Sequence, residues 1–307
     1  NKQHNHNDEY WPATCYIWIP SFQMSLISCK NSQEYKQEYV ILYKHSKNIA
    51  VIPKSIIKLI KSLDQKKYRK LSGLFLAEGN KMIHDLLASN IEIKTLIATQ
   101  GYLDAYASQI TSKTEVIESD RDQISKASLL KSPQEALALC KIPEYDLSEA
   151  NPAKDWVLCL DGIQDPGNMG TIVRIADWFG ITDIVCSPDT VDVFNPKSVQ
   201  ATMGSIFRTR VHYVELPGYF LTMKDKNIFI GGTFLEGDNL YAKRLPSSGI
   251  MVMGNEGSGI RNATVPYISD KIFIPSFAVG ENHAESLNVG VASAIICSEI
   301  RSRNFGE

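Results

Sequence analysis

From residue 155 onward, short runs of consecutive apolar residues alternate with segments of helical periodicity. The apolar runs include WVLCL, DIVC and GIMVM, and helical patterns follow in the stretch after Asp165, in PKSVQATMG and from about Glu285. Strands that are apolar on both faces must be covered on both faces, which is typical of a parallel sheet between helices. We therefore predict an α/β fold with a mostly parallel sheet for residues 155–307.

A smaller α/β domain is predicted for residues 51–145. The stretch PKSIIKLIKSL has the i, i+3, i+4, i+7 apolar spacing of an amphipathic helix, and GLFLAEG, KTLIAT and EVIES have the pattern of strands. The mostly polar residues 146–154 show no sustained period and are predicted to form a linker. Residues 1–50 are treated as an N-terminal extension that need not be ordered, and no function is assigned to them.

Charge and composition exclude several classes of protein. The 307 residues have a formal net charge of −2, so binding to nucleic acid must depend on a local basic patch. The hydrophobic content of 44% excludes a disordered or fibrous chain. No run approaches the roughly 20 apolar residues of a membrane span. We expect a cytoplasmic protein that does not contact a membrane.

The cysteines indicate neither a disulfide framework nor a metal site. They form no C-x-x-C pair and lie near no histidine cluster, so we expect buried, reduced thiols and no bound metal. The six are Cys15, Cys29, Cys140, Cys159, Cys186 and Cys297.

Three stretches that follow predicted strands combine glycine with Asn, Glu or Ser. They are DPGNMGTIVR, MGNEGSGI and IPSFAVGENHAESLNVGVA. Open parallel sheets bind ligands beyond the carboxyl ends of their strands, so these stretches are the candidate site. GNEGSG lacks the lysine of a Walker loop and the spacing of G-x-G-x-x-G, so neither nucleoside triphosphate nor dinucleotide binding is supported.

Arg174 lies opposite the apolar stripe of the first helix in these stretches. Two interpretations are open: a solvated charge paired with Asp177, or a fixed cation for an anionic substrate. Asn168, Glu256, Ser286 and Asn288 likewise allow two interpretations, because each is either a cap or turn residue or a functional group.

Taken together and in this order, the three stretches resemble the motifs of the SpoU (TrmH-like) family of RNA ribose 2′-O-methyltransferases, part of the SPOUT superfamily. The resemblance covers roughly residues 155–303, and residues 62–89 look like the substrate-binding domain that often precedes this catalytic domain. It implies a SPOUT fold with a deep C-terminal trefoil knot, S-adenosyl-L-methionine as cofactor, RNA (rRNA or tRNA) as substrate, and a homodimer.

The resemblance also implies roles for individual residues. The catalytic set is Arg174, Asn168, Glu256, Ser286 and Asn288. The cofactor set is Thr233, Leu235, Gly254, Asn255, Gly259, Ile274 and Leu287. Gln200 stands where many relatives have arginine, which affects expected substrate contacts only.

We expect Arg174 to bind the phosphate beside the target nucleotide, because a guanidinium keeps its proton too firmly to serve as a general base. Glu256 is expected to orient Arg174 or the ribose. A basic patch of Lys66, Lys67, Arg69 and Lys70 is predicted to bind RNA. The alternatives are a catalytically silent RNA-binding or ribosome-assembly factor and a SPOUT enzyme that methylates a base nitrogen.

Overall fold

A computed structural model of the chain describes residues 18–19, 22–23, 51–278 and 284–303. The chain divides into two compact units, residues 1–49 and 50–307. In the first unit, strands β1 (Trp18–Ile19) and β2 (Phe22–Gln23) pair antiparallel. Most of the predicted N-terminal extension lies outside the described residues.

In the second unit, residues 51–141 form a four-stranded sheet with helices around it. The sheet order is β3 (Leu74–Glu78), β6 (Ala136–Lys141), β4 (Ile93–Ala98) and β5 (Glu115–Glu118). Strand β6 pairs antiparallel with both of its neighbours, whereas β4 and β5 are parallel. The helices are α1 (Lys54–Ser62), α2 (Lys66–Ser72), α3 (Asn80–Leu87), α4 (Gln100–Tyr106) and α5 (Arg121–Ala127).

The second sheet is parallel throughout. Within the described residues its order is β11 (Asp238–Asn239), β13 (Asp270–Phe273), β10 (Ile230–Phe234), β12 (Gly249–Gly254), β7 (Trp156–Asp161), β8 (Asp183–Cys186) and β9 (Arg210–Tyr213). Every pair of neighbouring strands runs parallel. The predicted α/β fold with a mostly parallel sheet is therefore confirmed.

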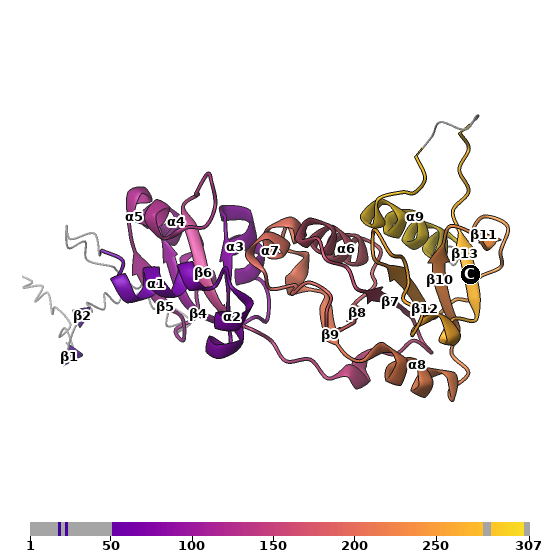
Figure 1. Cartoon of the computed structure of the whole chain (residues 1–307). Helices are drawn as coiled ribbons and strands as arrows, with labels where there is room; N and C mark the ends of the chain where they lie inside the picture. The colour runs from indigo at the N-terminus through magenta and orange to yellow at the C-terminus, as the bar shows by residue number, and fades with distance from the viewer. Residues whose placement is uncertain (1–17, 20–21, 24–50, 279–283, 304–307) are drawn as a thin grey trace, which may run out of the picture. The chain divides into compact units, whose positions relative to one another are not determined.

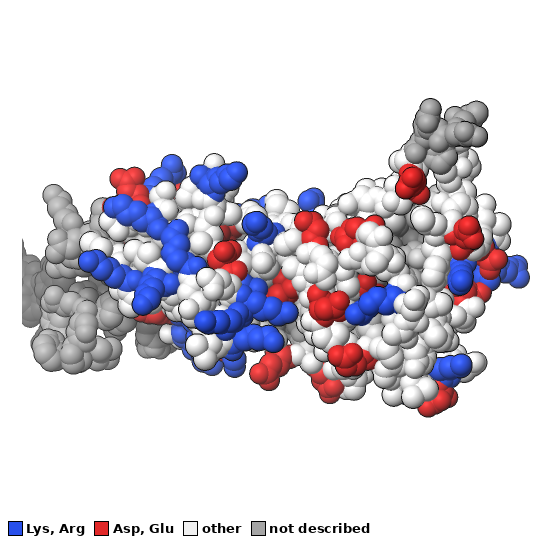
Figure 2. Space-filling model, viewed as in Figure 1, with Lys and Arg blue, Asp and Glu red and all other residues white. Residues whose placement is uncertain are grey.

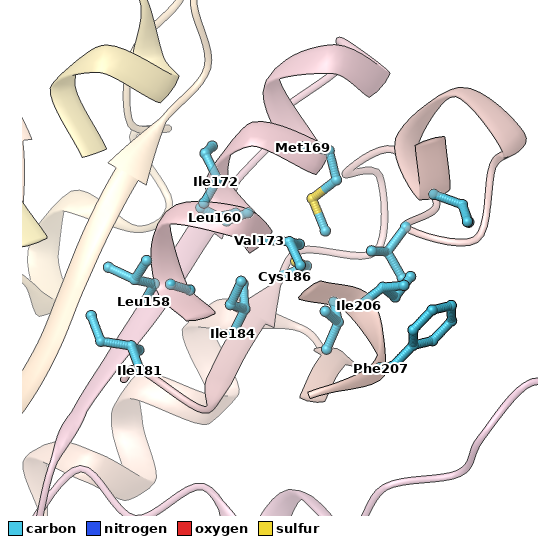
Figure 3. Close-up of a cluster of buried hydrophobic side chains, with 14 of the residues drawn as sticks. Leu158, Leu160, Met169, Ile172, Val173, Ile181, Ile184, Cys186, Ile206 and Phe207 are labelled. Carbon is cyan, nitrogen blue, oxygen red and sulfur yellow. The ribbon is translucent and has the colours of Figure 1, made fainter. Parts of the chain in front are cut away.

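Alternate residues of the central strands enter two separate cores. Leu158 and Leu160 of β7 pack with α6 (Pro166–Trp178) and α9 (Val289–Ser302). Val157 and Cys159 pack instead with α8 (Leu216–Lys224). Helix α7 (Pro196–Thr202) joins the first group, and Figure 1 shows α6 and α9 on one face of the sheet and α8 on the other. Figure 3 shows the first core, where side chains of β7, β8 and α6 meet. The strands are apolar on both faces because both faces are covered.

Two sequence predictions about the architecture are not tested. The domain boundaries at residues 51–145, 146–154 and 155–307 stay predictions, and so does the trefoil knot. Within the described residues, no helix is long and apolar enough to cross a bilayer.

Arg69 does not belong to an exposed basic patch, so that part of the predicted RNA-binding set is wrong. The side chain is 1% exposed, and its Nε and Nη2 lie 2.9 and 2.7 Å from Oδ2 of Asp192. Its Nη1 donates to the carbonyl oxygens of Leu63 (2.7 Å) and Asp64 (3.0 Å). These bonds use four of the five guanidinium N–H groups, and burial of the side chain keeps a phosphate from reaching the fifth. Arg69 therefore fastens α2 to the loop before α7.

We expect Arg69→Ala to lower the free energy of unfolding by about 3–5 kcal/mol, because it leaves the largely buried carboxylate of Asp192 without its partner. Urea unfolding followed by circular dichroism measures this. The neighbouring exposed Lys70→Ala is the control and should change stability by less than about 0.5 kcal/mol. Equal effects of the two substitutions would contradict a structural role for Arg69.

Candidate active site

The three glycine-containing stretches meet at one edge of the parallel sheet. Strand β7 leads into α6, β12 leads into residues 254–260, and the segment after β13 leads into α9. Strands β7 and β12 are neighbours, and the last residue of one, Asp161, pairs in register with the last residue of the other, Gly254. Parallel pairing therefore brings loops about 90 residues apart in sequence to the same place.

Asn168 joins the three stretches through its side-chain amide. Its Nδ2 donates to Oε1 of Glu256 over 2.7 Å, and its Oδ1 accepts from Nδ2 of Asn288 over 3.0 Å. Asn168 was a candidate cap of α6, but Asp165 supplies this cap. The Oδ1 of Asp165 accepts from the backbone N–H of Asn168 at 2.7 Å. Because Asp165 caps α6, the side chain of Asn168 is available to the other two loops.

Asn288 has two functions. Its Oδ1 accepts from the backbone N–H groups of Gly290 (2.9 Å) and Val291 (3.3 Å), so it is the N-cap of α9. Its Nδ2 is the donor to Asn168. The helix begins at Val289, four residues later than the pattern predicts, because this cap fixes its start.

The second loop is closed by its own backbone. The N–H of Asn255 donates to the carbonyl oxygen of Gly259 (3.0 Å), and the N–H of Gly259 donates back to the oxygen of Asn255 (2.9 Å). A side chain at Gly254 would collide with the backbone of Gly259, which is itself at φ +68°. The loop therefore needs glycine at both positions, and it presents the exposed Glu256 toward Asn168.

Arg174 is exposed and has no hydrogen bond or ion pair to any residue that the structure describes. The apolar stripe of its helix is buried as predicted, with Met169, Ile172 and Val173 in the core. Asp177 pairs with Arg208 rather than with Arg174, at 2.7 Å. Partial burial raises the pKa of Asp177, but hydrogen bonds from Arg208 and Ser205 lower it overall. The structure thus leaves the cation of Arg174 free for a ligand, without joining it to Asn168 or Glu256.

The remaining predicted site residues lie on the same group of loops, but few contacts join them. Ser286 is exposed just before α9, and no described contact links it to Asn168 or Asn288. Thr233 is the second-to-last residue of β10 and donates from Oγ1 to the carbonyl oxygen of Val252 at 3.3 Å. Leu235 and Leu287 are 67% and 49% exposed, and Ile274 is half-buried directly after β13.

The predicted basic patch keeps three of its four members. Lys66, Lys67 and Lys70 are exposed on α2. Figure 2 shows Lys and Arg side chains gathered over α1 and α2, with fewer on the part that holds the candidate site. The lysines of this surface, Lys66, Lys67 and Lys70, are called the basic face of α2 below.

Sequence reasoning missed Arg261, which pairs with Asp161 and Asp189 beneath these loops. One signal was available, since Asp161 is a carboxylate at the end of a fully apolar strand. No group of three or more metal-ligating side chains lies together in the described part of the chain.

Comparison with known proteins gives these loops their context. Residues 155–298 match the sequence model of the SpoU rRNA Methylase family, and residues 54–138 match the MRM3-like substrate binding domain. The Bacillus subtilis protein named 23S rRNA (guanosine(2553)-2′-O)-methyltransferase RlmP is 31% identical over 243 residues, which cover 78% of this chain and 94% of that protein.

Solved structures show the same likeness. A Porphyromonas gingivalis protein assigned to the TrmH family is 34% identical with a TM-score of 0.75, and the match covers 83% of this chain and all of that one. An rRNA methyltransferase from Sinorhizobium meliloti with bound AdoMet is 28% identical with a TM-score of 0.73, over 83% and 96% of the two chains. The resemblance of the motifs is thus confirmed: the chain belongs to the SpoU rRNA methylase family, whose members transfer methyl groups from S-adenosylmethionine to RNA.

Proposed function

We propose that this enzyme, an S-adenosylmethionine-dependent methyltransferase of RNA ribose 2′-hydroxyls, acts on the RNA of the large ribosomal subunit. One observation carries the proposal: the hydrogen-bond chain from Glu256 through Asn168 to Asn288, which assembles three motif loops at one edge of the sheet. The choice of RNA is supported by RlmP and by a Streptomyces viridochromogenes relative, 27% identical over 257 residues, which is named as a 23S rRNA 2′-O-methyltransferase.

The loops fit the cofactor. Leu235 and Leu287 leave apolar surface outside the core, which suits a purine, and the glycines at 254 and 259 let backbone approach a ligand closely. We assign the adenosine to Thr233, Leu235, Ile274 and Leu287, and the close backbone contacts to residues 254–259. When bound, S-adenosylmethionine supplies an electrophilic methyl group on its sulfonium.

The chain's own residues position the ribose and balance its charge. Glu256 has one oxygen occupied by Asn168, and the other has no described partner, so it can accept a hydrogen bond from a ribose hydroxyl. Arg174 binds the phosphate next to the target nucleotide and stabilises the alkoxide that develops as the hydroxyl proton passes to the free oxygen of Glu256 and from there to water. Ser286 and Asn288 hold the third loop against the substrate. Holding the oxygen in line with the methyl carbon is itself a large part of the catalysis.

In this proposal the parts of the chain that hold the two sheets have different functions. Residues 51–145 bind RNA through the basic face of α2, residues 155–307 transfer the methyl group, and residues 146–154 connect them. The match of residues 54–138 to a substrate binding domain supports this division.

We further infer that the protein is a homodimer. Trp178 at the end of α6 and Val291 on α9 are 84% and 51% exposed, although the two helices pack together in the core. The two residues lie at opposite ends of this helix pair, so a second copy that packs along both helices would cover both of them. Sedimentation equilibrium of the full chain tests this inference, and a monomeric mass would contradict it.

Purified protein should incorporate radiolabel from S-adenosylmethionine into unmodified 23S rRNA transcript in preference to tRNA. The label should appear in alkali-resistant dinucleotides, because a 2′-O-methyl group blocks cleavage at its own phosphodiester. Label in mononucleotides would indicate base methylation, and absence of label would indicate a silent RNA-binding factor.

Asn168→Asp should reduce incorporation at least about tenfold, since it replaces a hydrogen bond to the carboxylate of Glu256 by repulsion between two carboxylates. Asn262→Asp, on an exposed neighbouring residue, is the control.

Arg174→Ala should lower kcat/KM by about 10²–10³ while leaving the Kd for S-adenosylmethionine within about twofold, because the side chain serves the substrate. Calorimetry and single-turnover kinetics measure the two quantities. Arg174→Lys should restore part of the rate without a pH optimum that follows deprotonation of the lysine. A rate that rises with that deprotonation would instead make residue 174 the general base.

Lys66→Glu, Lys67→Glu and Lys70→Glu combined should weaken RNA binding and flatten its dependence on salt, by roughly 0.7–0.9 in the log–log slope for each lost phosphate contact. Filter binding at several salt concentrations measures this. The matched control changes three exposed lysines elsewhere, Lys154, Lys224 and Lys226, to Glu. If both triple variants bind alike, the basic face of α2 is not the RNA surface.

A further inference from the structure

Arg261 touches the loops that follow three neighbouring parallel strands. Strands β12, β7 and β8 are adjacent in the sheet, so their carboxyl ends lie side by side. Arg261 itself ends the loop after β12, and its side chain pairs with Asp161 at the end of β7 and with Asp189 in the loop after β8. A single arginine therefore connects residues at the carboxyl ends of all three strands.

The contact with Asp161 uses both the backbone and the side chain of Arg261. The backbone N–H donates to Oδ2 of Asp161 at 3.0 Å, and Nε donates to Oδ1 at 2.5 Å, with Nη2 also in contact. Asp161 is fully buried, so its carboxylate depends on this partner. Burial lowers the pKa of Arg261, but the hydrogen bonds and charge of Asp161 and Asp189 raise it overall, which keeps the guanidinium charged.

Nη1 of Arg261 bonds to the loop after β8, and this loop also bonds to the turn between β7 and α6. Nη1 of Arg261 lies 3.0 Å from Oδ1 of Asp189, and the carbonyl oxygen of Asp189 accepts from Nε2 of Gln164 at 2.9 Å. In the same loop, Ser187 and Thr190 accept from the N–H of Gly162 at 2.9 and 3.2 Å. The turn after β7 and the loop after β8 are thus bonded to one another, and Arg261 bonds to both.

The loop after β12 closes this arrangement from the other side. Nδ2 of Asn255 donates to the carbonyl oxygen of Gly162 at 2.7 Å, while its Oδ1 accepts from Gly257 and Ser258. Residues 254–260 are therefore fixed at their start by Asn255 and at their end by Arg261. Glu256, which bonds Asn168, lies between these two attachments.

We propose that Arg261 is a positioning residue for the cofactor: it holds residues 254–260 in the conformation that binds S-adenosylmethionine and aims Glu256 at Asn168. It does so without touching the methyl donor or the RNA, because both of its arms end on carboxylates of this chain. This inference rests on the proposed function, since it assigns the support of that same site.

The test compares binding of S-adenosylmethionine and of RNA by the full-length protein with Arg261→Lys. Lysine keeps the charge but cannot serve two carboxylates with the planar set of donors that arginine has. We expect the Kd for S-adenosylmethionine to rise about tenfold or more, the scale on which small displacements of positioned groups act. The Kd for 23S rRNA transcript should stay within about twofold, because the basic face of α2 is unchanged.

Arg208→Lys is the matched control. Like Arg261, Arg208 is paired with a carboxylate, here that of Asp177, through its Nε and Nη2. The side chains of the two arginines are similarly exposed, but Arg208 lies outside the loops of the site. It should leave both dissociation constants unchanged. If Arg261→Lys does not fold, as judged by circular dichroism, Asp189→Ala decides on the same readout, because it removes the acceptor of Nη1 of Arg261 and keeps the buried pair with Asp161.

The outcomes separate this inference from the proposed function. Wild-type protein that neither binds S-adenosylmethionine nor methylates RNA contradicts the proposed function. Wild-type protein that does both, together with an Arg261→Lys variant that binds S-adenosylmethionine as tightly as wild type, overturns the role of Arg261. Equal weakening of cofactor and RNA binding would also overturn it, because a general loss of structure would explain that result.

Discussion

The parallel pairing of β7 with β12 is the constraint on which the site depends. Six residues of each strand pair in register, from Trp156 opposite Gly249 to Asp161 opposite Gly254. Parallel strands end at the same edge, so this register brings the turn after β7 and the glycine loop after β12 together, and a slip along the ladder would separate them. The contacts of Asn168, Asn255 and Arg261 all span this junction.

Much of this arrangement could be predicted from the sequence, because it follows from local patterns. Continuous apolar strands indicated a parallel sheet, and the Asn, Glu and glycine positions after them indicated the loops of the site. Strand β6 was not among the predicted strands, and its residues ALALCK lie shortly before the stretch that was interpreted as a linker. Antiparallel pairing with both β3 and β4, which no local pattern encodes, makes it one of the two inner strands of its sheet.

Arginine is the residue type for which sequence reasoning was least reliable. Arg69 lies among solvated lysines, yet it is buried, because Asp192, 123 residues later, supplies a carboxylate and the two residues after α1 supply carbonyl oxygens. Arg261 has a similar dependence on Asp161, 100 residues earlier. The exposure of Arg174 could be predicted because the period of its own helix determines which way the side chain points. The burial of a side chain whose partner is distant in sequence cannot be predicted without the fold. The direction of a side chain on a helix can be predicted from the helical period alone.

Asn288 links the assembly of the site to the formation of α9. Its side-chain Oδ1 accepts from the first N–H groups of α9, and its side-chain Nδ2 donates to Asn168. Before residues 289–302 are helical and packed, nothing fixes the conformation of Asn288, and Asn168 lacks one of its two partners. Formation of α9 is therefore the step that completes the contacts of Asn168, so a change that unwinds the start of this helix should disturb the site as well as the core.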